Sequence, residues 1–305
     1  MKVRVGYGFG TQRGFTAAHF ASMVDTLDAL QFDSLWLSER ITADAPDPIV
    51  GLAVAAGRSE RLKLGTSVQV LPGRNPALLA KELATLDVLS NGRFLPGFGL
   101  GIAHPAEQQA FGIRREERAA YFDEALPLLR RFWTETAVDH VGERFHYEGL
   151  RVRPHPVQQP PDIWLGGRAP VELRRVGRLA DGWLASFSMP AECAAGRVAI
   201  EASAAEHRRS IDPEHYGAMI FYSPGELPEA VRSLIESRSP GVDAFDLVPA
   251  PSTTWSDASP NTSRSASPSS FWSRSTSPPI GRRNSSRSPD GSSPSRPSTA
   301  RLRLV

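Results

Sequence analysis

The feature that most limits the fold of this chain is a regular alternation of short β-rich runs with amphipathic helical patterns. The first four runs begin about 30 residues apart, as consecutive strand–helix units do. The strand candidates are residues 3–8, 34–37, 62–68, 94–99, 163–165, 182–185, 218–222 and 244–248. Eight such units predict an α/β fold with a parallel sheet closed as a (β/α)8 TIM barrel. An open doubly wound sheet is the alternative.

Helical periodicity fills the intervals between these runs. The helix candidates lie near residues 20–30, 48–56, 75–91, 116–133, 170–179, 191–208 and 227–235. Asn75 and Pro76 are typical of a helix start, and Asn91-Gly92 is typical of a helix end. The stretch 138–161 breaks the rhythm, so we expect an inserted hairpin and a proline-rich return after the fourth strand.

The last 48 residues differ in composition from the rest of the chain. Residues 258–305 contain 16 Ser, eight Arg and seven Pro, with few large apolar residues to offset the entropy of ordering. We therefore expect residues 1–257 to form the barrel, with an incomplete or missing eighth helix, and residues 258–305 to be a disordered tail. A shifted reading frame in a GC-rich gene yields such a mixture, and a genuine low-complexity tail is the alternative.

Charge and cysteine content limit the classes of function. The tail carries eight Arg and one Asp, so the formal total of +2 leaves −5 for residues 1–257 and gives the barrel no general reason to bind nucleic acid. Cys193 is the single cysteine, which fits a cytoplasmic location without disulfides. No signal peptide and no apolar run near the roughly 18 residues of a membrane helix are found. The histidines show no metal-ligand spacing.

The most informative candidate site is the turn after the fifth predicted strand. Gly166-Gly167 is followed by Arg168 and by a helix with Pro170 near its start. Glycines let backbone N–H groups approach an anion closely, the helix start adds a partial positive charge, and Arg168 adds a full one. This turn predicts a phosphate cradle. An ordinary strand-to-helix turn with a solvated arginine is equally compatible with the sequence.

Glycines also follow the fourth predicted strand, in the text Gly97-Phe98-Gly99-Leu100-Gly101. A dinucleotide fingerprint would require glycine at position 102, which is Ile102, and the next helix starts too late, so we exclude that motif. Gly99, Leu100 and Gly101 suit a strand end against which a flat ring lies. Glycines required by the curvature of the barrel are the alternative.

Charged residues after other strands are further candidates, because barrel active sites lie at the carboxyl ends of the strands. Glu39 and Arg40 follow the second predicted strand, where they either serve the site or simply pair with each other at a loop surface. His104 follows the fourth strand and is a candidate proton donor, since histidine titrates near neutrality. A loop histidine is, however, more often only solvated.

At these positions the chain resembles the bacterial luciferase-like monooxygenase family, in particular its branch of F420-dependent oxidoreductases. The similar text comprises SLWLSER at 34–40, the long block at 61–101, FHYEG, and residues 161–183. The resemblance implies a (β/α)8 barrel that binds F420, or alternatively FMN, at the carboxyl ends of its strands. It maps a ring-supporting bulge with an unusual cis peptide to Ser67-Val68, and phosphate binding to Gly166-Gly167-Arg168.

Two departures from the family pattern concern the chemistry. Relatives often read Ser-Asp-His where this chain has Ser38-Glu39-Arg40, and the sugar-phosphate dehydrogenases of the family have a carboxylate where this chain has Ile102. The second departure argues against a sugar-phosphate substrate and leaves the catalytic acid unassigned.

The implied activity is hydride transfer between F420 and a small organic substrate. An FMN-dependent monooxygenase using reduced flavin and oxygen, or a truncated inactive family member, are the alternatives. The candidate catalytic residues are His104 and Glu39. The candidate cofactor-binding residues are Arg40, Ser67, Val68, Gly99, Leu100, Gly101, Gly166, Gly167 and Arg168. No metal, nucleic acid or membrane is expected as a partner. Relatives in the family are often dimers, so a homodimer is a possible assembly.

Overall fold

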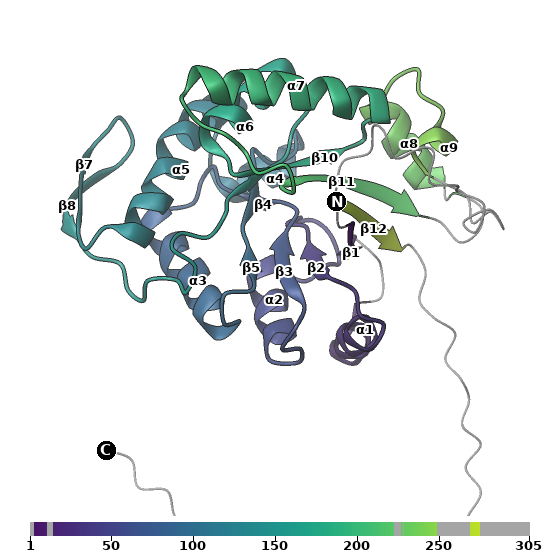
Figure 1. Ribbon diagram of the computed structural model, residues 1–305, viewed down its shortest axis with the longest axis horizontal. Helices are drawn as coiled ribbons and strands as arrows, with labels where there is room; N and C mark the ends of the chain where they lie inside the picture. The colour runs from purple at the N-terminus through teal and green to yellow at the C-terminus, as the bar shows by residue number, and fades with distance from the viewer. Residues whose placement is uncertain (1–2, 11–14, 223–226, 228, 249–268, 275–305) are drawn as a thin grey trace, which may run out of the picture.

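The computed structural model describes residues 3–10, 15–222, 227, 229–248 and 269–274. It is an α/β fold in which parallel strands form the interior and helices lie around them (Figure 1). The strands of the main sheet are β1 (Arg4–Phe9), β2 (Ser34–Leu37), β3 (Lys63–Thr66), β4 (Gln69–Val70), β5 (Phe94–Leu95), β6 (Gly97–Gly99), β9 (Trp164–Leu165), β10 (Gly182–Ser186), β11 (Tyr216–Tyr222) and β12 (Ser269–Arg274).

Most helices follow a strand directly. They are α1 (Ala17–Ala29), α2 (Pro48–Ala56), α3 (Pro76–Leu89), α4 (Pro105–Phe111), α5 (Arg118–Thr134), α6 (Pro170–Leu179), α7 (Pro190–Glu206), α8 (Glu229–Arg238) and α9 (Ala244–Leu247), with a 3-10 turn at Arg115–Glu117. Five of them begin with proline, whose missing N–H has no partner in the first turn of a helix in any case. The predicted start of α3 is confirmed, because the Asn75 side chain accepts hydrogen bonds from the Ala77 and Leu78 N–H groups.

The order of the strands follows from their pairing. The sheet reads β4-β6-β9-β10-β11-β12-β1-β2-β3-β5, and every pair in it is parallel. Ser67-Val68 interrupts the chain between β3 and β4, and Pro96 interrupts it between β5 and β6. Because β3 pairs with β5 and β4 with β6, these two interrupted runs lie beside each other along their length.

Both faces of the strands are buried, as they are in parallel sheets that are covered on each side. In β2, Leu35 and Leu37 pack into the large apolar core, whereas Trp36 joins a separate cluster with Trp164 and Leu184. This alternation follows from the two-residue period of a strand. The rings of Trp36 and Trp164 meet edge to face with centroids 6.1 Å apart.

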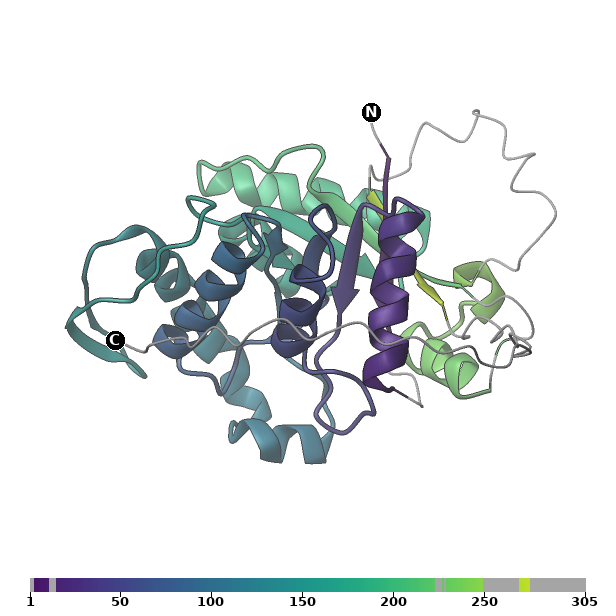
Figure 2. The same cartoon turned by 90° about the horizontal axis from the view of Figure 1, so that it is seen from below.

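The hairpin expected after the fourth strand is present. The strands β7 (Val138–Val141) and β8 (His146–Leu150) form an antiparallel pair that projects from the body of the molecule (Figures 1 and 2). The turn that connects them is held by Glu124 of α5, whose carboxylate accepts hydrogen bonds from the Arg144 and Phe145 N–H groups.

The eighth predicted strand, at residues 244–248, is wrong. These residues form α9, whose first turn is capped by Asp243 accepting a hydrogen bond from the Phe245 N–H group. Ala244 and Val248 are buried together with Leu227 and Ile235, while Phe245 is 51% exposed. Burial at positions four apart is typical of a helix. The run of apolar residues is too short for this period to be recognised in the sequence.

The strand between β11 and β1 comes from the segment that we expected to be a disordered tail. Ser269–Arg274 forms β12, which pairs in parallel with both neighbours. The main-chain groups of β1 and β11 need partners, and any extended segment supplies them regardless of its side chains. Six residues of this segment thus form a strand, and the expected disorder of residues 258–305 as a whole stays a prediction. Residues 258–268 and 275–305, and with them the expected absence of an eighth helix, lie outside the described residues.

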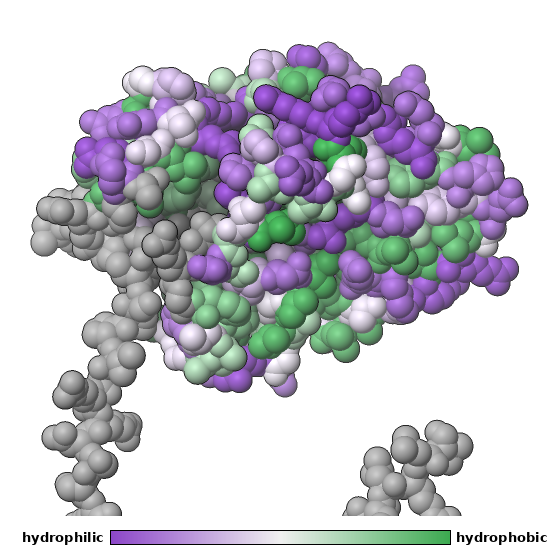
Figure 3. Space-filling model, turned by 180° about the vertical axis from the view of Figure 1, so that it is seen from behind, coloured by the Kyte–Doolittle hydropathy of each residue, from purple (hydrophilic) through white to green (hydrophobic). Residues whose placement is uncertain are grey.

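The outer surface is mixed in character. On the face shown in Figure 3, polar residues cover most of the surface and apolar residues form separate patches among them. None of the helices in the described part of the chain is long and apolar enough to cross a membrane.

Candidate functional site

A cavity of about 430 Å³ opens where the carboxyl ends of the central strands meet. Its size falls within the range of small-molecule sites. The wall is formed by residues at or directly after the carboxyl ends of β1, β2, β3, β6, β9, β10 and β11, with further contributions from β4, α5, α6 and α8. Every predicted cofactor-binding residue lines this cavity, and so does Glu39. The fold therefore brings together side chains that are scattered over more than a hundred positions of the sequence.

The bulge between β3 and β4 forms one side of the cavity. The peptide bond between Ser67 and Val68 is cis, as the family resemblance implied. The neighbouring segment after β2 holds the bulge, because the Ser38 hydroxyl donates to the Ser67 carbonyl at 2.8 Å and the Glu39 N–H group donates to the Val68 carbonyl at 3.1 Å. These bonds fix where the Val68 side chain enters the cavity wall.

Glu39 is a buried anion within this support. It is 5% exposed, and its Oε2 accepts hydrogen bonds from the Val70 N–H group at 2.7 Å and the Gln69 amide at 3.0 Å. Its Oε1 accepts from the Arg74 guanidinium. Burial raises the pKa of Glu39, against the opposing effects of Arg74 and the Val70 N–H group. With both oxygens bonded inside the protein, the carboxylate supports the bulge, and its catalytic role stays a prediction.

Arg40 does not pair with Glu39, contrary to one alternative raised by the sequence. Its Nε donates instead to Oε1 of Glu107 on α4, at 3.4 Å. The same Glu107 carboxylate accepts hydrogen bonds from the Ile41 N–H group at 3.1 Å, the Thr42 N–H group at 3.0 Å and the Thr42 hydroxyl at 2.6 Å. Burial alone would raise the pKa of Glu107, but the hydrogen bonds from Thr42, Ile41 and Arg40 outweigh it and hold this pKa below its ordinary value.

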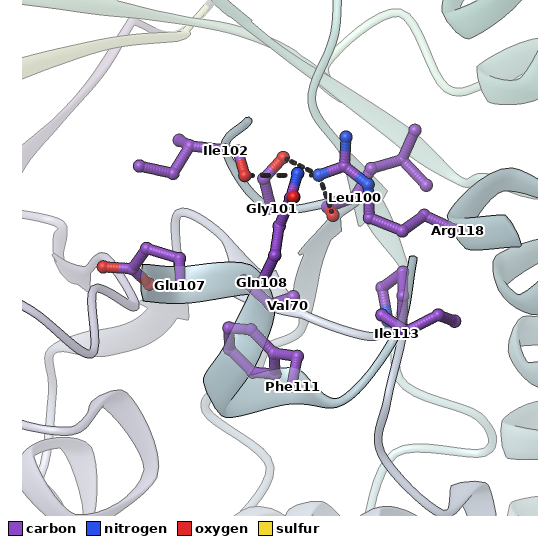
Figure 4. A pocket seen from close by; sticks show the side chains of 10 residues that line it. Val70, Leu100, Gly101, Ile102, Glu107, Gln108, Phe111, Ile113 and Arg118 are labelled. Atoms are coloured by element: carbon purple, nitrogen blue, oxygen red, sulfur yellow. Dashed lines mark hydrogen bonds between the residues drawn. The ribbon is translucent and has the colours of Figure 1, made fainter. Parts of the chain in front are cut away.

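The glycine-rich end of β6 packs closely against the bulge. A Cβ on Gly99 would lie 2.5 Å from Cγ2 of Val68, so only glycine fits at this position. The following residues, Leu100, Gly101 and Ile102, are held by Arg118 at the start of α5 (Figure 4). Nη1 of this buried arginine donates to the three carbonyls of the segment at 3.1, 2.9 and 3.3 Å. Arg118 thus fixes the main chain on this side of the cavity.

The turn after β9 forms another side of the cavity. Gly167 adopts a φ of +110°, which favours glycine. The Arg168 and Ala169 N–H groups both donate to Oε2 of Glu172 at 2.9 Å, so the start of α6 already holds an internal carboxylate. The Arg168 guanidinium donates to the Phe187 carbonyl at 2.8 Å and to the Ser239 hydroxyl at 3.0 Å. These bonds tie the turn to the segment after β10 and to the end of α8.

The charge of the wall is predominantly positive. It contains the four arginines Arg40, Arg168, Arg175 and Arg238, and the two carboxylates Glu39 and Glu172. Arg175 is buried and donates to Asp123 at 2.7 Å, whereas Arg168 and Arg238 are exposed to solvent. Apolar residues such as Phe98, Leu184 and Met219 fill the wall between these charges. A cavity of this kind fits a flat ligand with an anionic end, such as F420 or FMN.

His104 is the predicted site residue that lies apart from the others. It precedes α4, makes no capping hydrogen bond through its side chain, and is exposed. Among the described residues that line the cavity, His104 is not included. Its role as a proton donor stays a prediction, and this position gives it no added support.

The sequence did not point to three residues that shape the site. The side chains of Glu107 and Arg118 form hydrogen bonds with main-chain groups of distant segments. A local sequence pattern does not predict such contacts. Glu172 was detectable in principle, because a glutamate three residues after a helix cap is typical of a capping box. The short helix α4 was also not predicted, since its seven residues carry little periodicity.

Comparison with known proteins gives one family match. The family model described as luciferase-like monooxygenase matches residues 3–269. Among curated proteins, the F420-dependent glucose-6-phosphate dehydrogenase of Kineococcus radiotolerans is 30% identical over 192 residues, which are 60% of this chain and 56% of that protein. The chain spans about half the length of several curated relatives that it matches.

Two solved structures share the fold at low sequence identity. An F420-dependent secondary alcohol dehydrogenase in complex with an F420-acetone adduct superposes with a TM-score of 0.75 at 16% identity, covering 90% of this chain and 94% of that one. The oxygenating constituent of 3,6-diketocamphane monooxygenase from Pseudomonas putida, in complex with FMN, superposes with a TM-score of 0.64 at 20% identity, covering 77% of this chain and 71% of that one.

Proposed function

Because the chain belongs to the luciferase-like monooxygenase family, we propose that it is an oxidoreductase that transfers a hydride between coenzyme F420 and a small organic substrate. The observation that carries this proposal is the cavity itself. Its wall combines the Ser67-Val68 bulge, the glycines after β6 and the Gly166-Gly167-Arg168 turn around one space.

The cofactor would lie across the cavity from the turn after β9 to the bulge. Arg168, with Arg238 beside it in the wall, would hold the phosphate and acidic groups, while Val68 would support one face of the ring. When bound, the cofactor supplies the two-electron chemistry, and the protein supplies position and electrostatics. The internal bonds of Glu39 and Arg118 would keep the two sides of the wall rigid around it.

We propose further that the parallel sheet closes as a (β/α)8 barrel. The pairing of β3 with β5 and of β4 with β6 joins the two ends of the strand order, and β12 occupies the interval between β11 and β1. If each interrupted run is counted as one strand, eight strands form the ring. This closure would bring all the strand ends that line the cavity onto one face.

The alternative activity is an oxygen-dependent reaction of reduced FMN. It is favoured by the fold shared with the FMN complex of the diketocamphane monooxygenase. The curated relative from Kineococcus radiotolerans, which is named as F420-dependent, favours F420. The two cofactors share a phosphate and a flat tricyclic ring, so the cavity wall described here suits either one.

Titration of the full chain with F420 and, separately, with FMN tests the proposal. We expect F420 to bind with a micromolar or lower Kd, seen as a change in its fluorescence. Tighter binding of FMN would favour the alternative activity. Folded protein, verified by circular dichroism, that changes the spectrum of neither cofactor would contradict both activities.

We also propose that the enzyme acts on a small molecule in the cytoplasm, without nucleic acid as a partner. Residues 1–257 carry a formal charge of −5, and the free Cys193 suits a reducing compartment. Size-exclusion chromatography with light scattering tests directly whether the chain forms a homodimer.

The composition of residues 258–305 leads to a separate proposal about the gene. Their Ser, Arg and Pro content differs so sharply from that of residues 1–257 that we infer a shifted reading frame beyond Asp257. Resequencing the gene tests this inference. An intact frame would show that the segment is a genuine low-complexity extension that also supplies β12.

A further inference from the structure

The order of the strands places two arginines, Arg168 and Arg40, on different sides of the cavity. Arg168 follows β9, and Arg40 follows β2. Along the strand pairs β2-β3, β3-β5, β4-β6 and β6-β9, the two interrupted runs lie between Arg40 and Arg168. If the proposed function holds, a cofactor that extends from Arg168 to Val68 leaves Arg40 beyond its ring. Arg40 would then face the space left for the substrate.

The side chain of Arg40 has unused hydrogen-bonding capacity. Its Nε donates to Glu107 at the long distance of 3.4 Å, and the described residues provide no hydrogen bond to its Nη1 or Nη2. The side chain is 32% exposed and forms part of the cavity wall. A guanidinium stays protonated at any physiological pH and presents two parallel N–H groups, which match the two oxygens of a carboxylate.

Glu107 positions Arg40 through its Nε alone and accepts no hydrogen bond from its Nη1 or Nη2. The Glu107 carboxylate is 3% exposed and takes its three shorter hydrogen bonds from Ile41 and Thr42, the residues that directly follow Arg40. Its charge is therefore balanced largely by those groups. The loop is fixed through its main chain, while the outer guanidinium nitrogens of Arg40 remain available to a ligand.

From this arrangement we propose that Arg40 binds a carboxylate group of the substrate and that Glu107 is its positioning residue. The enzyme accordingly takes small organic acids in preference to neutral molecules of the same shape. This inference rests on the proposed function for the place of the cofactor. The binding of an acid by Arg40 can nevertheless be measured without any cofactor.

The test compares two probes of equal size: levulinate, and the neutral ketone in which an isopropyl group replaces its carboxylate. Binding is measured by thermal shift on the cofactor-free chain, and by cofactor fluorescence on the F420-loaded chain. We expect levulinate to bind more tightly than the neutral ketone. Arg40→Gln should weaken levulinate binding about tenfold or more, while binding of the neutral ketone should stay the same.

Three further variants make the test specific. Arg40→Lys keeps the charge without the paired N–H groups and should retain part of the affinity for levulinate. Glu107→Gln should reduce the preference for levulinate over the neutral ketone, which a purely structural role would not change. Arg151→Gln removes an exposed arginine outside the cavity wall and should leave both probes unaffected.

Two results would overturn the proposal. One is equal binding of levulinate by the wild-type and Arg40→Gln chains. The other is a wild-type chain that binds levulinate no better than the neutral ketone. Failure of F420 to bind would contradict the proposed function alone, because the thermal-shift comparison on the cofactor-free chain would still decide whether Arg40 binds a carboxylate.

Discussion

The loop after β2 and the turn after β9 use the same device on two sides of the cavity. In each, one carboxylate accepts hydrogen bonds from two consecutive main-chain N–H groups. Glu107 binds those of Ile41 and Thr42, and Glu172 binds those of Arg168 and Ala169. The difference lies in their origin, because Glu107 comes from a distant helix and is buried, whereas Glu172 lies in the first turn of the helix that follows directly and lines the cavity.

Because of this difference, Glu107 is a fixed acceptor for its two N–H groups, whereas a ligand can replace Glu172 as the acceptor for its own two. When a buried carboxylate accepts hydrogen bonds from another segment, its removal leaves buried N–H donors without a partner. Unpaired buried donors lower the free energy of unfolding. A carboxylate at the cavity wall can be replaced at the start of its helix by a ligand anion or by water. Glu107 is therefore a fixed support of the loop after β2, whereas Glu172 lies in the cavity wall itself.

The largest effect is expected for Glu107→Ala. This change leaves the Ile41 and Thr42 N–H groups and the Thr42 hydroxyl without their acceptor and should lower the free energy of unfolding by about 3 kcal/mol. Denaturation in urea measures it. Glu107→Gln is the matched control, since its amide oxygen still accepts hydrogen bonds and should preserve more of the stability. An unchanged midpoint for Glu107→Ala would show that water replaces the carboxylate.

A smaller effect is expected from acid. The hydrogen bonds of Glu107 hold its pKa below its ordinary value in the folded chain, so its contribution to stability is complete above the unfolded pKa and is lost as the pH falls through the folded pKa. Protonation keeps the side chain in place, so the loss should be smaller than in Glu107→Ala. The difference in unfolding free energy between wild type and Glu107→Gln, measured from neutral pH down to pH of about 3, should shrink with acid. A constant difference would contradict this.

The affinity for the cofactor should depend on Arg168, which lies in the turn after β9, across the cavity from the loop after β2. Arg168→Ala removes a charge-assisted interaction worth roughly 1.5–3 kcal/mol, so the Kd for F420 should rise by about tenfold or more. Stability should change less than in Glu107→Ala, because Arg168 is exposed and water can replace its donors to Phe187 and Ser239. Fluorescence titration of the variant gives the Kd, with Arg151→Ala as a control outside the cavity. An unaltered Kd would assign Arg168 to the surface alone.

The smallest effect is expected for Glu172→Gln. The amide keeps an acceptor for the N–H groups of the turn but removes a negative charge from the start of α6, which should lower the unfolding free energy by about 0.5 kcal/mol. The same change removes a like charge from the wall near the proposed phosphate position. The Kd for F420 should therefore fall severalfold, opposite in direction to Arg168→Ala. A weaker binding of F420 would show that Glu172 itself helps to hold the cofactor.

Much of the framework followed from local patterns in the sequence. Asparagine and proline at the start of α3 act over a few residues, and the structure contains this helix start. The strand expected at residues 34–37 is also present as β2. The cis peptide at Ser67-Val68 was instead implied by the family resemblance. The eighth strand failed because a short apolar run does not distinguish a strand from a turn of helix, so Ala244–Leu247 became α9 instead.

The hydrogen-bond and ion-pair partners of the charged side chains in the site could not be predicted from local sequence patterns. Neighbouring side chains leave the backbone in different directions, so Glu39 turns toward Gln69, Val70 and Arg74, while Arg40 turns toward Glu107. Which distant segments meet them depends on the folded sheet. The same holds for Arg118, whose donors serve carbonyls that no pattern within α5 indicates.

The long reach of Glu107 has a consequence for the course of folding. Thr42 and Glu107 are 65 positions apart in the chain, so the loop that carries Arg40 gains its anchor only after a large intervening segment has been brought into place. Contacts of such separation form late, since their loop-closure entropy is offset only once the elements between them have packed. During refolding, protection of the Ile41 and Thr42 amides from hydrogen exchange should lag behind that of β2, so the ability to bind ligand would arise after the sheet itself.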